Sequence, residues 1–208
     1  MAEYLDEHEQ WEQVLAWLRE QGPWMLGTVV VVLLGFGGWR YWQAHKQRTE
    51  LAAEAGYEQV LDLFDRNDFA GGTKAADRLI KDFPSTPYAD MADLAVARVA
   101  VEHSQLAQAA TRLTHVVDTT RDPELKLLAR LRLARVQLGD GMADAALKTL
   151  AAVNPGAFAA RYAEVRGDAL LAKGDRAGAL RAYMAARSDS DTLDSSLLDL
   201  KIDDLAHS

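Results

Sequence analysis

The sequence predicts an all-helical protein in which one membrane-spanning helix precedes an array of helical hairpins. Three observations lead to this fold class. The stretch from Gln21 to Trp39 carries no charged side chain. The remainder shows few of the apolar and polar alternations that are typical of strands. Its turn signals recur every 32 to 37 residues, which is typical of solenoids built from helix pairs.

The charge-free stretch is long enough to cross a bilayer. Its 19 residues would rise roughly 30 Å as a helix, which matches the hydrocarbon thickness. Valine and leucine surround the helix at Val29–Leu34, whereas a buried core helix of this length would keep a polar face. Aromatic residues mark both ends, as interfacial belts do, with Trp24 on one side and Trp39, Tyr41 and Trp42 on the other.

We therefore expect a signal-anchor helix at residues 21–42. A removable signal peptide would begin with basic residues and end with small ones, but this chain begins acidic and follows its span with WRYWQA. Gly35 and Gly38 permit close contact with a partner helix. The ordinary composition of membrane helices explains these glycines equally well.

Residues 1–20 form a short acidic segment with six acidic residues against the single Arg19. This segment is either an interfacial helix that contacts lipid or a partner, or a solvated extension of the span. Its apolar residues have helical spacing: Trp11, Val14, Leu15 and Leu18.

Residues 43–208 have the size and composition of one helical domain with a core of its own. The net charge of the chain is −8, but 22 basic residues face 25 acidic ones after the span. Such a balance lacks the excess of basic residues that is typical of proteins that bind nucleic acids. The chain has no cysteine, which excludes disulfides, thiol nucleophiles and cysteine-bound metals and suits either redox compartment.

Two kinds of break divide the domain into helix pairs. Three dipeptides place an N-cap side chain before a proline and predict helix starts: Thr86-Pro87, Asp122-Pro123 and Asn154-Pro155. Between apolar-periodic stretches lie four breaks that predict the turns inside the pairs: residues 66–69, 102–105, 138–142 and 172–176.

Three of these pairs show the small, turn and large positions of a tetratricopeptide repeat, in which small residues allow the two helices to cross closely. No Trp-x-x-Leu-Gly signature is complete, so an ordinary antiparallel bundle is the alternative. The matching sets are Gly167, Gly174, Ala179, Tyr183 and Ala186; Ala134, Gly141, Ala146, Leu150 and Val153; and Ala97, Ser104, Ala109, Leu113 and Val116.

The two ends of the array depart from this pattern. The first pair, around Tyr57 to Phe83, fits poorly, and we expect a degenerate end unit. The last segment, TLDSSLLDLKIDDLA, predicts a closing helix that carries Leu193, Leu197, Leu200 and Leu205 on one face. The predicted fold is thus a tetratricopeptide-like solenoid of helical hairpins with a C-terminal closing helix.

No catalytic or metal site is predicted. The chain has no His-Glu-x-x-His motif or other ligand spacing among its five histidines, and its glycine-rich GFGGW lies inside the predicted span. Neighbouring acids such as Asp203 and Asp204 do not converge on one point of a helix. We expect a non-enzymatic protein without a cofactor. The histidines are His8, His45, His103, His115 and His207.

The first helices of successive pairs line the concave surface of a tetratricopeptide array. The repeat register therefore predicts a groove that binds a partner or an unfolded client protein. The alternative is that its leucines only complete the core. The candidate groove residues are Met91, Leu94, Arg98, Val101, Leu128, Leu131, Arg135, Leu138, Arg161, Glu164, Asp168 and Leu171.

Together, these features resemble the YfgM family of bacterial inner-membrane proteins. The resemblance is strongest at Gly38–Trp42 and in the run LRLARVQL, ADAALKTL and RGDALLAKGD between Leu131 and Asp175. It implies an ancillary subunit of the SecYEG translocon that works alongside the anchored chaperone PpiD and passes unfolded, translocated clients to periplasmic chaperones. It also implies a single-pass topology with a cytoplasmic N-terminus and a periplasmic domain.

The charges around the span favour the opposite orientation. Arg40, Lys46 and Arg48 follow the span, whereas Arg19 is the only basic residue before it. By the positive-inside tendency these charges would keep the domain in the cytoplasm. The alternative function is therefore a cytoplasm-facing, membrane-anchored scaffold that tethers a soluble partner.

Overall fold

The computed structural model describes the backbone of residues 4–151, 153–188 and 195–206, and the side chains of residues 11, 17, 24, 31–151, 153–188 and 196–206. All regular elements in these ranges are helical, which confirms the all-helical part of the prediction. In chain order they are α1 (Tyr4–Asp65), α2 (Phe69–Asp82), α3 (Pro87–Glu102), α4 (Leu106–Thr119), α5 (Pro123–Gly139), α6 (Ala143–Ala151), the 3-10 turn η1 (Gly156–Phe158), α7 (Ala159–Ala172), α8 (Arg176–Ser188) and α9 (Ser195–Ala206).

The chain divides into two compact units, Met1–Ala52 and Ala53–Ser208. Helix α1 supplies the described structure of the first unit and continues to Asp65, so its last part belongs to the second unit. There it packs against α2 and α3, since Val60 and Phe64 share a buried cluster with residues of both helices.

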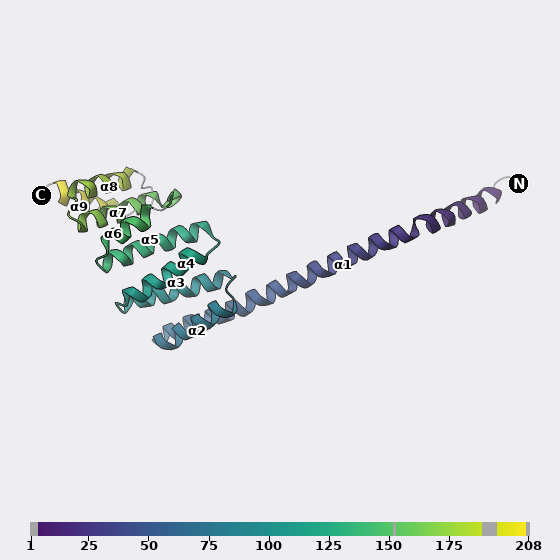
Figure 1. The fold of residues 1–208 in the computed structure, drawn as a ribbon, viewed down its shortest axis with the longest axis horizontal. Coiled ribbons are helices and arrows are strands. Elements are labelled where there is room, and N and C mark those ends of the chain that lie inside the picture. The colour runs from purple at the N-terminus through teal and green to yellow at the C-terminus, as the bar shows by residue number, and fades with distance from the viewer. Residues whose placement is uncertain (1–3, 152, 189–194, 207–208) are drawn as a thin grey trace. The chain divides into compact units, whose positions relative to one another are not determined.

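The helices of the second unit stack in chain order from α2 to α8, as Figure 1 shows, and α9 lies beside α7 and α8. Each packs against the next, and α5 also contacts α7, so one hairpin lies against the following one. The hairpins consist of residues 53–65 with α2, α3 with α4, α5 with α6, and α7 with α8, and α9 closes the array. This arrangement confirms the predicted solenoid of helix pairs.

One turn geometry recurs in all four hairpins. The residues Asn67, Ser104, Gly141 and Gly174 have positive φ angles of 59°, 59°, 77° and 84°. In each turn, the N–H of this residue donates to the carbonyl three residues back, and the next N–H donates to the carbonyl five back. Such a left-handed residue closes a helix by the Schellman pattern. The first pair, expected to be degenerate, thus turns in the same way as the others.

Two of the three predicted Pro starts begin α-helices, at Pro87 and Pro123. The carboxylate of Asp122 accepts two backbone N–H groups of the first turn of α5 at 2.8 and 3.1 Å. Thr86 makes no such cap, because its hydroxyl donates to the carbonyl of Phe83 at 2.9 Å.

The third predicted start is displaced. Pro155 precedes the single turn η1, and α7 begins only at Ala159. Asn154 Oδ1 accepts from the N–H of Gly156 at 3.2 Å, and Gly156 has a φ of +52°. The asparagine therefore closes a tight turn, and the left-handed glycine delays the helix.

The small and large positions of the three predicted repeats lie in the core of the second unit. Their alanines, leucines and valines are buried except Val153, which is half-buried, and Tyr183 is 1 % exposed. The repeat register deduced from the sequence is therefore also the packing register of the helices.

The closing helix turns a different face to the core than predicted. Leu198 and Ile202 are buried and Leu205 packs beside them, whereas Leu197 and Leu200 are exposed. Leu193 lies outside the described residues. Two apolar stripes with helical spacing run along this helix, and periodicity alone does not decide between them.

Candidate functional site

The predicted groove residues all lie on α3, α5 and α7, the first helices of the second, third and fourth hairpins. Their exposure separates them into a surface set and a packing set. Met91, Arg98, Val101, Arg135 and Arg161 are exposed, Leu94, Leu128, Leu138, Glu164, Asp168 and Leu171 are half-buried, and Leu131 is buried.

Several leucines of this set pack into the core. Leu131 is 1 % exposed and shares a cluster with Leu150 and Tyr162, so the candidate surface is corrected to exclude it. Leu138 borders the same cluster, and Leu94 and Leu171 border two others. A leucine between two stacked hairpins gains more from burial against its neighbours than from exposure to solvent. The accessible candidate surface is therefore mostly polar.

The charges of this surface largely pair with one another. Arg98 bonds Glu102 one turn away at 3.2 Å, and Arg135 approaches Glu164 to 3.9 Å. The side chains of Arg98, Glu102 and Arg135 are half exposed or more, so solvent screens both pairs, although the side chain of Glu164 is only 16 % exposed. They keep the surface soluble and leave it without a fixed excess of either sign.

At the C-terminal end the same surface holds the closing helix. Lys201 of α9 donates to Glu164 at 2.9 Å and to Asp168 at 2.8 Å, and the hydroxyl of Tyr183 donates to Asp168 at 2.7 Å. Desolvation lowers the pKa of Lys201, but its bonds to Asp168 and Glu164 outweigh this effect and raise the pKa. Burial and then the bond to Asp168 raise the pKa of Tyr183. Glu164 and Asp168 thus bind α9.

A second polar cluster, which sequence reasoning missed, braces α2, α3 and α4. The buried Asp93 accepts from Arg112 at 3.2 Å and contacts Nδ1 of His115 at 2.6 Å, and Arg112 also donates to Asp77 at 2.6 Å. A buried carboxylate requires such partners because an unpaired one is costly. The paired residues are 19 to 35 positions apart, so no local spacing could reveal them.

The contacts of this cluster are ion pairs between residues of different helices. His115 is oriented by an acid, yet no cysteine exists in the chain to be activated by it. Within the described residues, no group of three or more His, Cys, Asp or Glu side chains could hold a metal ion. The arrangement is suited to joining three helices.

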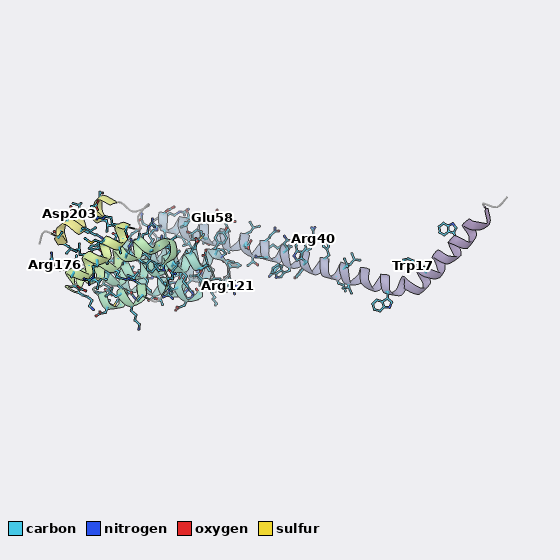
Figure 2. All side chains as sticks on the ribbon, turned by 90° about the horizontal axis from the view of Figure 1, so that it is seen from above. Trp17, Arg40, Glu58, Arg121, Arg176 and Asp203 are labelled. Atoms are coloured by element: carbon cyan, nitrogen blue, oxygen red, sulfur yellow. The ribbon has the colours of Figure 1, made fainter. Side chains whose placement is uncertain are left out.

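The predicted anchor residues lie on α1 in the first unit. Trp24, Trp39, Tyr41 and Trp42 are exposed, and a Cβ added at Gly35 or Gly38 would meet open space. Figure 2 shows Trp17 projecting from the same helix.

Among the described residues, no helix has an apolar stretch long enough to cross a membrane. The side chains of residues 21–23 and 25–30, which form much of the predicted span, lie outside the described residues.

Comparison with solved structures supports the fold. The chain resembles a structure entitled "MamA RS-1 ArsTM double mutant" with a TM-score of 0.55 at 14% identity, over 74% of this chain and 94% of that one. At this identity the likeness concerns the arrangement of helices alone.

Comparison with families and curated proteins covers almost the whole chain. A family described as "Tetratricopeptide repeat-like domain" matches residues 15–207. The protein of Escherichia coli (strain K12) named "Ancillary SecYEG translocon subunit" is 35% identical over 98% of both chains. A protein of the same name from Aggregatibacter actinomycetemcomitans is 30% identical over 99% of this chain and its own full length. This chain therefore belongs to the tetratricopeptide-like YfgM family, whose curated members are named ancillary SecYEG translocon subunits.

Proposed function

We propose that this chain is a non-enzymatic ancillary subunit of the SecYEG translocon that helps pass translocated proteins to periplasmic chaperones. The observation that carries the proposal is the match to the E. coli subunit over 98% of both chains. That match includes both the charge-free segment and the helical array, so it relates the whole architecture and not the repeats alone.

The chemistry of the helical array favours binding over catalysis. Its paired surface charges and half-exposed apolar side chains, such as Met91 and Val101, suit weak contacts with polypeptide segments of varied sequence. The strongest polar clusters join helices to one another, as at Asp93 and Lys201. Among the described residues these clusters therefore support an adaptor.

The proposal includes a single membrane span at residues 21–42. Its support is the charge-free sequence and the aromatic residues at its two ends. The full-length chain should stay in the membrane fraction after an alkaline carbonate wash, and a chain without residues 1–44 should be soluble and helical. Release of the full-length chain by carbonate would contradict the anchor.

The translocon association is tested with the full-length protein. A tagged chain purified from membranes in mild detergent should bring SecYEG and a PpiD-like chaperone with it. A variant with a shuffled span serves as the control for detergent-driven association. Absence of SecYEG from the native preparation, with the chain intact and in the membrane, would refute the proposal.

Client contact is tested by site-specific photo-crosslinking during translocation. A crosslinker at Arg98 or Arg135, both exposed on first helices, should capture a translocating chain or the partner chaperone. One at Lys148, exposed on α6, should not. Equal yields at the two kinds of position would remove the first-helix surface from the proposal and leave the translocon association standing.

A second candidate function is a scaffold that faces the cytoplasm, which is favoured by Arg40, Lys46 and Arg48 after the span. Because the chain has no cysteine, Ser188→Cys gives a unique and exposed thiol. A membrane-impermeant thiol reagent should label it in cells whose outer membrane is permeabilised. Protection until lysis would favour the scaffold over the periplasmic adaptor.

A further inference from the structure

An open cleft of about 490 Å³ lies between two connections that join successive hairpins. The α2–α3 connection contributes Ser85, the α4–α5 connection contributes Thr120 and Arg121, and α3 contributes Asp90 and Met91. Figure 2 shows Arg121 at the edge of the second unit. The cleft therefore opens at the loop edge of the array.

Asp90 is the unusual group in this cleft. It is half-buried, and its hydrogen-bond partner is Thr120, a neutral hydroxyl. Burial raises the pKa of Asp90 above its usual value, and the bond from Thr120 offsets only part of this effect. No described Lys, Arg or His forms an ion pair with Asp90. The carboxylate is partly desolvated and lacks a cation.

Besides burial, the charges of Asp93 and Asp122 raise the pKa of Asp90, whereas the charge of His115 lowers it, so the neighbouring charges do not neutralise Asp90. One turn further along α3, Asp93 holds both Arg112 and His115 in ion pairs. Asp122 accepts the first N–H groups of α5 and so serves its own helix. The exposed Arg121 is the basic residue that lines the cleft, and it lowers the attraction for a densely basic ligand.

Apolar groups flank the carboxylate. Met91 is 44 % exposed, Leu125 is half-buried, and the rings of Pro84 and Pro87 are exposed along the same cleft. A ligand that satisfies both kinds of group needs one cation with an apolar side chain beside it. Such a side chain gains about 25 cal/mol for each Å² that it buries.

We infer that this cleft binds an extended polypeptide segment in which a single lysine or arginine, flanked by apolar residues, pairs with Asp90 while its neighbours contact Met91 and Leu125. The inference rests on the proposed function, because it names the chemistry of the client segment. It adds a client contact at the loop edge to the first-helix surface, and it gives that contact a preference in sequence. A metal ion fits less well, since the cleft offers only two carboxylates, Asp90 and Asp122, and Asp122 already accepts the first N–H groups of α5.

The test compares two short, unstructured, fluorescently labelled peptides that differ only at their centre, Leu-Lys-Leu against Leu-Gln-Leu. Their binding to the full-length chain in detergent is measured by fluorescence anisotropy. We expect the Lys peptide to bind about tenfold more tightly, which corresponds to about 1.4 kcal/mol, because an ion pair in a partly desolvated site is stronger than one in bulk water. Asp90→Asn, which keeps an acceptor for Thr120, should abolish this difference and leave binding of the Gln peptide unchanged.

Asp140→Asn is the matched control, since it removes an exposed carboxylate outside the cleft. Equal loss of Lys-peptide binding in the two variants would mean that only the net charge acts, and it would overturn the inference. So would equal binding of the two peptides to the native chain. Binding of the Gln peptide also shows that each variant is folded.

The position of the peptide is checked with a photo-crosslinker attached to Ser85→Cys in the cleft or to Lys148→Cys on α6. Capture of the Lys peptide at the first position alone is the expected result, and equal capture at both would overturn the inference. The outcomes are separable from those of the proposed function. If SecYEG copurifies but neither peptide preference nor cleft capture occurs, the cleft inference fails alone. If the cleft captures the peptide but SecYEG does not copurify, the proposed function fails.

Discussion

In both the last and the first hairpin, a glycine on one helix lies against an aromatic ring on the other, so the two helices cross closely. The helix that carries the glycine differs between the two hairpins. In the last, Gly167 of α7 lies against the ring of Tyr183 in α8. In the first, Gly72 of α2 lies against the ring of Phe64 in α1. A Cβ on either glycine would overlap the ring. The two pairs therefore differ in which helix carries the aromatic side chain, and they share the packing device.

The two hairpins also share the start of their second helix. Asp68 Oδ1 accepts the N–H of Gly71 at 2.8 Å, and Asp175 Oδ1 accepts the N–H of Gly178 at 2.8 Å. In each case the aspartate directly follows the left-handed turn residue. The tetratricopeptide pattern places the small residue on the first helix of a pair. It therefore recognises only the last pair, although both pairs pack in the same way.

The largest effects should come from removal of the two rings. Tyr183→Ala and Phe64→Ala should each lower the free energy of unfolding by about 3–5 kcal/mol, the range for buried aromatic side chains. Tyr183 should cost more, because it is 1 % exposed against 8 % for Phe64 and also bonds Asp168. Thermal unfolding of the full-length chain, followed by circular dichroism, measures both.

Met184→Ala is the control for this pair of variants, since Met184 lies beside Tyr183 in the chain but is 47 % exposed. It should change stability by no more than about 0.5 kcal/mol. If Phe64→Ala behaved like Met184→Ala, the first hairpin would not be an equal unit of the core.

A smaller loss is expected when a methyl group is added opposite each ring. Gly167→Ala and Gly72→Ala should each destabilise the domain by about 1–3 kcal/mol, because the ring must move in a packed core. Gly139→Ala is the matched control, since its Cβ would meet only one atom of Leu106 at an ordinary 3.7 Å. A stabilised Gly72→Ala variant would show that the first crossing is loose.

The sequence predicted the hairpin array because its signals are local. Turn residues, N-caps before proline and small residues at helical spacing each act within one or two turns of helix, and they placed Pro87, Pro123 and the three repeats correctly. The first pair was expected to be degenerate because its small and large residues are exchanged. The prediction of the buried face of α9 was wrong because two apolar stripes of similar spacing begin at Leu197 and Leu198.

Less of the candidate site could be predicted, because its contacts connect distant residues. The ion pairs from Asp93 to Arg112 and from Glu164 to Lys201 join residues 19 and 37 positions apart. The burial of Leu131 depends on α6 and α7, which a single helix does not reveal. The cleft at Asp90 depends on two loops that approach each other only in the folded array.

The shared helix caps should give equal and moderate effects. Asp68→Ala and Asp175→Ala should each cost about 1 kcal/mol, the usual cost of losing an N-cap side chain. Amide hydrogen exchange of the full-length chain should show faster exchange in the first turn of α2 or of α8, respectively. An effect at Asp175 alone would show that the two caps differ in their contribution to stability, although their hydrogen bonds are alike. Asp118→Ala is the control, because Asp118 is exposed on α4 and does not cap the start of a helix.

The smallest effect, and one of opposite sign, is expected at the second hairpin turn. Ser104 has a φ of +59°, where a side chain crowds the backbone, and the corresponding residues of the other turns are Asn67, Gly141 and Gly174. Ser104→Gly should stabilise the domain by about 0.5–1 kcal/mol, because relief of the left-handed strain exceeds the extra freedom that glycine gives the unfolded chain. The melting temperature should rise by about 2 °C.

Asn67→Gly should gain less stability, since asparagine tolerates this conformation better than serine does. A Ser104→Gly variant less stable than the native chain would mean that serine adapts to this turn without strain, and the four turns would then not be energetically equivalent.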